Sequence, residues 1–209
     1  MARKGRPRTV AVALAAALAA VLGVALLATG PADAAGRYKT VTKTFHNFSP
    51  IAINDNAPAT PYPSPLAAGE MRRGKILVAD VTLRGLTHTW PHDVNVLLVG
   101  PRGQNATIMS DAGGNFGVSN VTLTLDDEAA NSMSEAGQLV GGTFKPSNPT
   151  EPLDSFPGAP APSGLVALST FDRTNPNGIW DLYVVDDGIS DAGRFASGWS
   201  ITIKARILR

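Results

Sequence analysis

The chain has no cysteine among its 209 residues. Disulfide bonds and cysteine-based zinc sites are therefore excluded, and so is catalysis by a thiol. Core packing must hold the fold together, and a bound metal could add to it. Aromatic residues are also few, at 6%, and the three histidines are His46, His88 and His92. Any site that depends on imidazole chemistry has to be built from this small set.

Long apolar runs are absent except near the start of the chain. Residues 1–34 open with basic residues, continue with an apolar run from Val10 to Ala28, and end in Ala32-Asp33-Ala34, which fits a small-residue cleavage site. This pattern predicts a secretory signal peptide. An uncleaved membrane anchor is the alternative, because the run is close to the roughly 20 residues that span a bilayer. We expect cleavage, which would leave residues 35–209 secreted and free of the membrane.

The expected mature chain has no surplus of positive charge. Of 18 Lys and Arg, four lie in residues 1–34, and of 17 Asp and Glu one lies there, which leaves 14 basic and 16 acidic residues. The net charge is then near −2, so nucleic acid and anionic membranes are not favoured partners. A chain of this length suits one domain with its own core.

A β-hairpin is predicted over residues 93–110. The apolar run that follows Asp93 ends at Gly100, and a second short strand covers 106–110. Between them Pro101 fixes one φ angle, and Gly103 is free to adopt a positive one, so the chain can reverse. The Gly-rich loop at 111–115 leaves the hairpin and carries oxygen ligands.

Further strands are indicated by period-two alternation at 38–48, 75–84, 120–125, 139–144, 178–186 and 198–209. Trp180 and Trp199 alternate in step with aliphatic residues, which is typical of core anchors. The proline-rich segment 49–66 is predicted to be a surface loop with Ile51 and Ile53 turned inward, and 145–163 a second long loop. Residues 126–134 have the composition for one helical turn, and 165–168 for the start of a short element.

No helical period persists for three turns anywhere after residue 34. Seven or eight short strands with Pro- and Gly-rich connections predict an all-β fold. The simplest arrangement is an antiparallel jelly-roll β-sandwich.

Two segments resemble a known family. The first is Asp93-Val-Asn-Val-Leu-Leu-Val-Gly-Pro-Arg-Gly with the following Met-Ser-Asp-Ala-Gly-Gly, and the second is Asn177-Gly-Ile-Trp-Asp-Leu-Tyr-Val-Val-Asp-Asp-Gly with the later Gly198-Trp-Ser-Ile-Thr-Ile. In this order they are similar to the P domain (P/Homo B domain) of proprotein convertases, above all to bacterial secreted forms. The resemblance extends from about Lys75 to Ile203.

The resemblance implies a galactose-binding-like jelly roll that accompanies a subtilisin-like or metalloprotease catalytic domain and supports its folding, stability or specificity. This chain departs from the family pattern because it has no catalytic domain of its own. The resemblance therefore implies a module associated with serine-protease proteolysis rather than a protease.

Catalytic motifs are not found in the sequence. It has no Gly-x-Ser-x-Gly elbow, no His-Glu-x-x-His helix and no subtilisin-type Gly-Thr-Ser. His88 and His92 have a spacing that would suit zinc on a helix, but Pro91 argues against a helix there. A small hydrolase with its site among His88, His92 and the nearby aspartates remains an alternative, as does a glycan-binding module.

Acidic residues gather at strand ends, and they predict a calcium site. We take Asp93, Asp111, Asp126, Asp127 and Asp186 as candidate ligands. Calcium takes six to eight oxygens, and a Gly-rich loop lets backbone carbonyls join carboxylates, so Asp111 beside Asp126 and Asp127 would make a plausible cage. The alternative is that these carboxylates form Asx turns.

The sequence thus predicts a secreted, non-catalytic β-sandwich that binds or stabilises a protein partner, with calcium as the one cofactor it suggests. The expected partner is a protease or a cell-surface protein.

Overall fold

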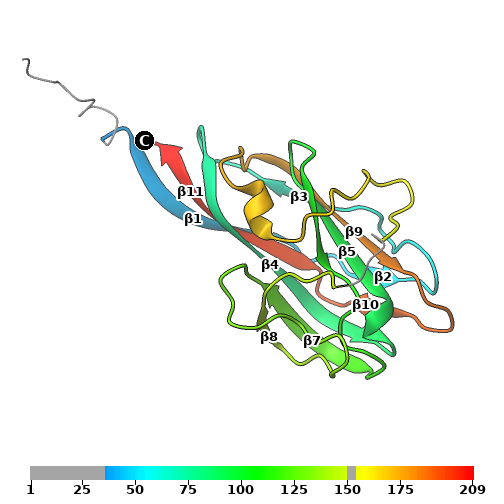
Figure 1. Ribbon diagram of the computed structural model, residues 1–209. Helices are drawn as coiled ribbons and strands as arrows, with labels where there is room; N and C mark the ends of the chain where they lie inside the picture. The colour runs from blue at the N-terminus through cyan, green and yellow to red at the C-terminus, as the bar shows by residue number, and fades with distance from the viewer. Residues whose placement is uncertain (1–35, 150–153) are drawn as a thin grey trace, which may run out of the picture. The chain divides into compact units, whose positions relative to one another are not determined.

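The computed structural model describes residues 36–149 and 154–209 (Figure 1). The signal peptide expected at residues 1–34 lies outside these ranges. Within them, no helix is long and apolar enough to cross a membrane.

Strands dominate the described residues, which contain eleven strands and two short 3₁₀ helices. The strands are β1 (Tyr38–Asn47), β2 (Ile51–Ile53), β3 (Ser64–Ala68), β4 (Lys75–His88), β5 (Val94–Val99), β6 (Asn105–Met109), β7 (Val118–Leu125), β8 (Gly142–Phe144), β9 (Gly178–Asp186), β10 (Gly193–Phe195) and β11 (Trp199–Leu208). The 3₁₀ helices are η1 (Pro91–Asp93) and η2 (Leu168–Phe171). The expectation of an all-β fold is confirmed.

The larger sheet has seven strands. Its main path is β1-β11-β4-β10-β2, with β7 paired to β4 and β8 to β7. All these pairs are antiparallel except β7 with β8. The first and last strands lie side by side, so Tyr38 is opposite Leu208.

The smaller sheet has the order β3-β9-β5-β6 and is antiparallel throughout. The β5–β6 pair is the hairpin predicted over residues 93–110, and Gly103 in its turn has φ +82°. Strand β9 lies on the other side of β5, with Val94 opposite Asp186. The hairpin is thus paired with a strand that begins 69 positions after the hairpin ends, from Met109 to Gly178.

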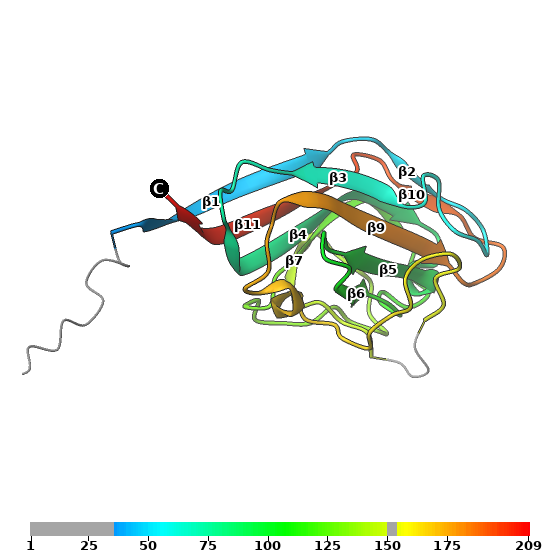
Figure 2. The same cartoon turned by 90° about the horizontal axis from the view of Figure 1, so that it is seen from above.

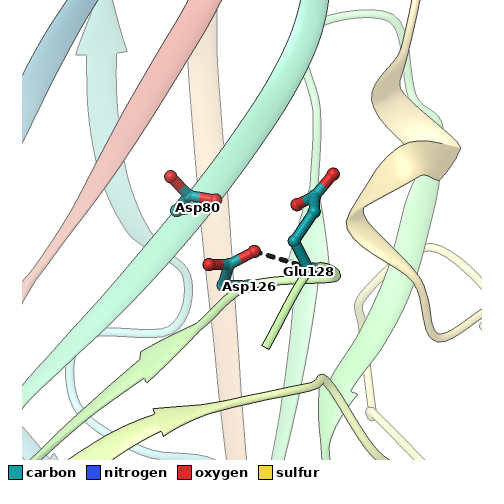
Figure 3. A group of neighbouring side chains, drawn as sticks. All are labelled: Asp80, Asp126 and Glu128. Carbon is teal, nitrogen blue, oxygen red and sulfur yellow. Dashed lines mark hydrogen bonds between the residues drawn. The ribbon is translucent and has the colours of Figure 1, made fainter. Parts of the chain in front are cut away.

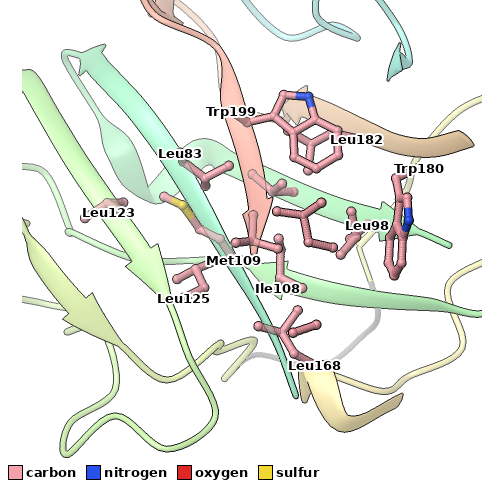
Figure 4. Close-up of a cluster of buried hydrophobic side chains, with 14 of the residues drawn as sticks. Leu83, Leu98, Ile108, Met109, Leu123, Leu125, Leu168, Trp180, Leu182 and Trp199 are labelled. Atoms are coloured by element: carbon pink, nitrogen blue, oxygen red, sulfur yellow. The ribbon is translucent and has the colours of Figure 1, made fainter. Parts of the chain in front are cut away.

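Both sheets contribute to one hydrophobic core. Figure 2 shows β9 and β5 of the smaller sheet beside β4 and β11 of the larger one, and Figure 4 shows core side chains from both. Trp180 and Trp199 are fully buried, as their alternation predicted. Each indole N–H is satisfied, donating to the Pro176 carbonyl at 3.0 Å and to the Ser64 hydroxyl at 3.2 Å respectively. Buried indoles with partners of this kind fix how the sheets pack.

The strands exceed the seven or eight predicted because three short ones form in segments rich in Pro or Gly. β2 and β3 lie in the predicted loop 49–66, and β10 lies in the connection between β9 and β11. β3 tolerates Pro65 because it is an edge strand and pairs only with β9 among the described strands. Ile51 and Ile53 are buried, as expected.

The helical turn suggested for 126–134 does not form. Asp126 instead accepts the backbone N–H of Glu128 at 2.8 Å, and the chain continues as a turn. Such Asx turns compete with helix formation. The element suggested at 165–168 corresponds to η2, which begins at Leu168.

Candidate functional site

Three carboxylates converge on the outer side of the larger sheet (Figure 3). Asp80 comes from the middle of β4, whereas Asp126 and Glu128 come from the turn after β7. β7 is paired with β4 so that Leu125 is opposite Val81. This register places the turn that follows Leu125 beside Asp80. One oxygen from each of the three lies within 4.8 Å of the others, and we call this group the acidic cluster.

Mutual repulsion and burial shape the electrostatics of the acidic cluster. Burial, followed by the charges of Asp126 and Asp127, raises the pKa of Asp80 to about 6. The Oδ1 atom of Asp80 is buried and has no hydrogen-bond partner. The hydrogen bond with Asp126, followed by partial burial, raises the pKa of Glu128. A cation would relieve the repulsion and supply the partner that the Asp80 oxygen lacks.

Asp127 is not a member of the acidic cluster and instead supports η2. Its two carboxylate oxygens accept the backbone N–H groups of Leu168 and Ser169, at 2.8 and 2.7 Å. These are the first N–H groups of η2, which have no partner within the helix. Asp127 therefore acts as the cap of a distant 3₁₀ helix, and its neighbour Asp172, with its pKa raised by burial and then by the charge of Asp127, shares that environment.

Asp111 has a different set of neighbours. The hydroxyl of Ser110 lies 3.1 Å from its Oδ2, and Nδ1 of His92 lies 3.5 Å from its Oδ1. Among the described residues, the grouping of three ligand-type side chains that could hold a metal is the acidic cluster, and it contains Asp126 but neither Asp111 nor Asp127. The structure thus places the three members of the predicted cage in three different contacts.

Asp93 and Asp186 do lie near each other, where β5 begins and β9 ends. Burial, then the charges of Asp186, Asp187 and Asp191, raises the pKa of Asp93 to about 6. Its carboxylate packs against Gly188, where a Cβ would come within 1.9 Å of Oδ2. Gly188 has no side chain, and this leaves the space that the Asp93 carboxylate occupies.

Asp186 is held by His88. Nε2 of His88 lies 3.0 Å from Oδ2 of Asp186, and neither side chain is exposed to solvent. The other ring nitrogen accepts the backbone N–H of Trp90 at 3.2 Å. Nδ1 is therefore the acceptor and Nε2 the donor, and no ring nitrogen of His88 is left to act as a base.

Two cavities flank the loop that precedes β7. One, of about 550 Å³, is lined by residues of β4, β7 and the 138–141 segment. The other, of about 470 Å³, is lined by Trp90, His92, Gly114, Asn115, Glu135 and Ala136. Trp90 is 42% exposed, so part of its side chain is open to solvent there.

Sequence reasoning included Asp126 and missed Asp80. Asp80 is the one acidic residue of β4, and in a two-sided pattern it falls on the outer face. A carboxylate within a strand is a signal, but its partners became visible only once β7 was paired with β4.

Comparisons with known proteins give little. No family model matches the sequence, and no curated protein matches it. Among solved structures, the crystal structure of Aeromonas sobria serine protease (ASP) in complex with the chaperone (ORF2) is similar over 82% of this chain, with 12% identity and a TM-score of 0.39. This chain corresponds to 27% of the length of the chain it matches. A similarity of this size does not assign a family.

Proposed function

We propose that residues 35–209 form a secreted, non-catalytic module of the P-domain type, with a jelly-roll arrangement of its two sheets. The module binds or stabilises a protein partner, which we take to be a protease of the subtilisin or convertase type or a cell-surface protein. Calcium bound at the acidic cluster stabilises it.

The observation that carries this proposal is the pairing of β5 with β9. The two motifs that resemble the P domain, 93–103 and 177–188, include these strands. β5 and β9 are adjacent and antiparallel, with pairs from Val94–Asp186 to Val99–Asp181. The third matching stretch, from Gly198, enters β11 of the other sheet. Motifs that together characterise one family are expected to form one structural unit. The two motifs in β5 and β9 do so, because these strands pair with each other.

Calcium fits the acidic cluster chemically. Asp80, Asp126 and Glu128 offer hard carboxylate oxygens, which are the ligands that calcium prefers. The Oδ1 of Asp80 has no hydrogen-bond partner, and burial and the nearby charges of Asp126 and Asp127 raise the pKa of that carboxyl. A divalent cation would supply a partner and reduce the repulsion between the carboxylates. Water and backbone carbonyls would have to complete the coordination, as is usual for weak extracellular calcium sites.

The contacts of His88 and the burial of Ser110 support a non-catalytic role. Both ring nitrogens of His88 make contacts within the fold, and Ser110, the serine next to Asp111, is fully buried. A nucleophile that water and substrate cannot reach cannot attack. The hydrolase alternative would have to use His92, which is partly exposed beside Asp111.

Thermal unfolding of residues 35–209 in excess EDTA and then in millimolar calcium tests the metal part of the proposal. At a hundredfold excess over Kd, binding adds about 2.7 kcal/mol to the free energy of unfolding, which is a shift of several degrees in Tm. The shift should vanish in Asp80→Asn and persist in Glu135→Gln, an exposed acidic residue outside the cluster. Equal shifts in both variants would remove the acidic cluster from the proposal.

The partner part is tested by binding to a purified subtilisin-type protease, with hydrolysis of a broad peptide library measured in parallel. We expect measurable association with the protease and no turnover by the module alone. Turnover that a single Ser→Ala or His92→Ala substitution abolishes would favour the hydrolase alternative instead.

A glycan-binding role is the second candidate, and the 470 Å³ cavity favours it. An exposed indole at Trp90 lies with Asn115 and Glu135 around a hollow of a size typical of small-ligand sites. A flat aromatic face flanked by polar side chains suits a ring that is apolar on one face and carries hydroxyls at its rim. Binding on a glycan array that Trp90→Ala removes would support this role, and an empty array would exclude it.

A further inference from the structure

One group of charges outside the sites described above is positive, although the expected mature chain is slightly acidic. Lys75 opens β4 and Arg206 lies near the end of β11, the strand that ends at the C-terminus in Figure 1. These two residues are directly opposite each other in the β4–β11 pair. Like charges at directly opposed positions of a sheet are destabilising, so this pairing calls for an explanation outside the sheet.

A third cation joins the pair around a cavity. Lys75, Arg173 and Arg206 line a hollow of about 440 Å³, together with Ile76 and Leu77. All three cationic side chains are exposed, and within residues 36–149 and 154–209 none of them forms an ion pair. We call this hollow the basic pocket. Asp172, next to Arg173 in the chain, feels the charge of Arg173 but forms no ion pair with it. A ligand could neutralise the remaining charge.

Arg173 is held at the basic pocket by an uncommon backbone conformation. Its φ is +60°, a left-handed value that non-glycine residues rarely adopt. The backbone N–H of Arg173 donates to the Ile76 carbonyl at 2.9 Å, and the N–H of Ile76 donates to the Thr174 carbonyl at 3.1 Å. These two bonds fix the backbone of Arg173 against the first residues of β4, so its side chain extends from a held segment at the basic pocket.

More positive charge lies at the neighbouring ends of β1, β4 and β11. The backbone N–H of Leu208 donates to the Arg72 carbonyl, and that of Arg209 to the Arg37 carbonyl, so three further arginines gather where β1, β4 and β11 meet. The guanidinium of Arg206 also lies 5.0 Å from the ring centroid of Tyr38. A stacked guanidinium keeps its fork of N–H donors free for an acceptor.

The lining of the basic pocket is not purely ionic. Leu77 is 42% exposed, and Ile76 beneath it is buried. A ligand that fits must therefore offer anionic groups to the cations and an apolar group to Leu77. The volume falls within the 300–1,000 Å³ typical of ligand sites and is large for a single inorganic anion.

We propose that the basic pocket is the docking site for an acidic peptide segment of the protein partner, with carboxylates on Lys75, Arg173 and Arg206 and one apolar side chain on Leu77. Guanidinium groups bind carboxylates through two parallel hydrogen bonds, and arginine clusters recognise acidic motifs in this way. A sulfated glycan or a nucleic acid would meet the cations but would leave Leu77 without an apolar contact.

This inference rests on the proposed function, because it names the chemistry of the partner. It would fail separately from that function if the module bound a protease with unchanged affinity when Lys75 and Arg206 were replaced. The function would fail separately if the peptide bound but no protease did.

The test uses fluorescence anisotropy of a labelled peptide that carries glutamates on both sides of a single leucine. We expect saturable binding that weakens as salt is added, because the contacts are exposed and screened. Replacing the glutamates by glutamines should abolish binding, and replacing the leucine by serine should weaken it. Arg206→Gln should weaken it about tenfold, as expected for the loss of one charged hydrogen-bonded contact, whereas Arg194→Gln, at an exposed residue of β10, should not.

Three outcomes would overturn the proposal. One is tighter binding of a heparin oligosaccharide than of the peptide, with the same loss in Arg206→Gln, because the occupant would then be a glycan. Another is full competition by inorganic phosphate at equal concentration, which would make the basic pocket a simple anion site. The last is salt-sensitive self-association that Arg206→Gln removes, because the occupant would then be a second copy of this chain.

Discussion

His88 and Asp186 meet inside the fold although they are 98 positions apart in the chain. His88 ends β4 in the larger sheet and Asp186 ends β9 in the smaller one, so their contact joins the two sheets. Both side chains are completely buried, and the ring is anchored on its other side by the N–H of Trp90. A buried carboxylate needs such a donor, because burial alone raises its pKa.

Removing His88 should therefore be strongly destabilising. In His88→Ala the Asp186 carboxylate loses its side-chain partner while it stays buried, and we expect a loss of about 3 kcal/mol or more in the free energy of unfolding. Urea denaturation measures it. The control is His46→Ala, an exposed residue of β1, which should stay within about 0.5 kcal/mol of the wild type. A mild effect at His88 would mean that water replaces the ring.

Acidification should stabilise the wild type through Asp80. Its folded pKa of about 6 lies above the ordinary value of 3.8, so the folded state binds the proton more tightly than the unfolded state does. The destabilising effect of its charge is then full above pH 6 and fades as the pH falls toward 4. In EDTA, Asp80→Asn should be more stable than the wild type at pH 7.5 and equal to it near pH 4. A difference that does not change with pH would contradict this account.

Asp127 should behave as a cap rather than as a metal ligand. Asp127→Ala removes the acceptor of the Leu168 and Ser169 N–H groups, and we expect a loss of about 1 kcal/mol. The loss should be the same in EDTA and in calcium, whereas the effect of Asp80→Asn should differ between the two. If calcium enlarged the loss in Asp127→Ala, Asp127 would belong to the metal site after all.

Gly193 should tolerate no side chain. A Cβ there would lie 2.2 Å from the Thr87 carbonyl oxygen and 2.3 Å from Cδ2 of His88, and the first of these atoms is backbone that cannot rotate away. We expect Gly193→Ala to cost about 1–3 kcal/mol, in the range of an overpacked site. Gly69→Ala is the matched control, because no atom lies within 4 Å of its added Cβ. Thermal unfolding of the two variants side by side checks the expectation.

The strands that sequence reasoning found are those with enough alternation to be read locally. The alternation around Trp180 and Trp199 indicated β9 and β11, and Gly103 indicated the turn between β5 and β6. β3 was missed because Pro65 argues against a strand, and only its position at the sheet edge makes that proline harmless. β10 was missed because three residues carry too little pattern to separate from a Gly-rich loop.

The candidate sites were harder to predict because they depend on pairing. Asp126 was identified from its own neighbourhood, but Asp80 joins it only through the register of β7 on β4. The same holds for Lys75 and Arg206, which come together only when β4 pairs with β11. The net charge of the chain did not indicate this pair, because it contains no information about where the charged residues lie in the fold.

The pairing of β1 with β11 also sets the order in which the fold can be completed. Among the described strands, β1 has β11 as its one sheet partner, and β11 follows every other described strand in the chain. The ten residues of β1 therefore have no strand to pair with until β11 has been synthesised. The larger sheet can close only then, so β1 joins it late, through contacts between residues far apart in the chain.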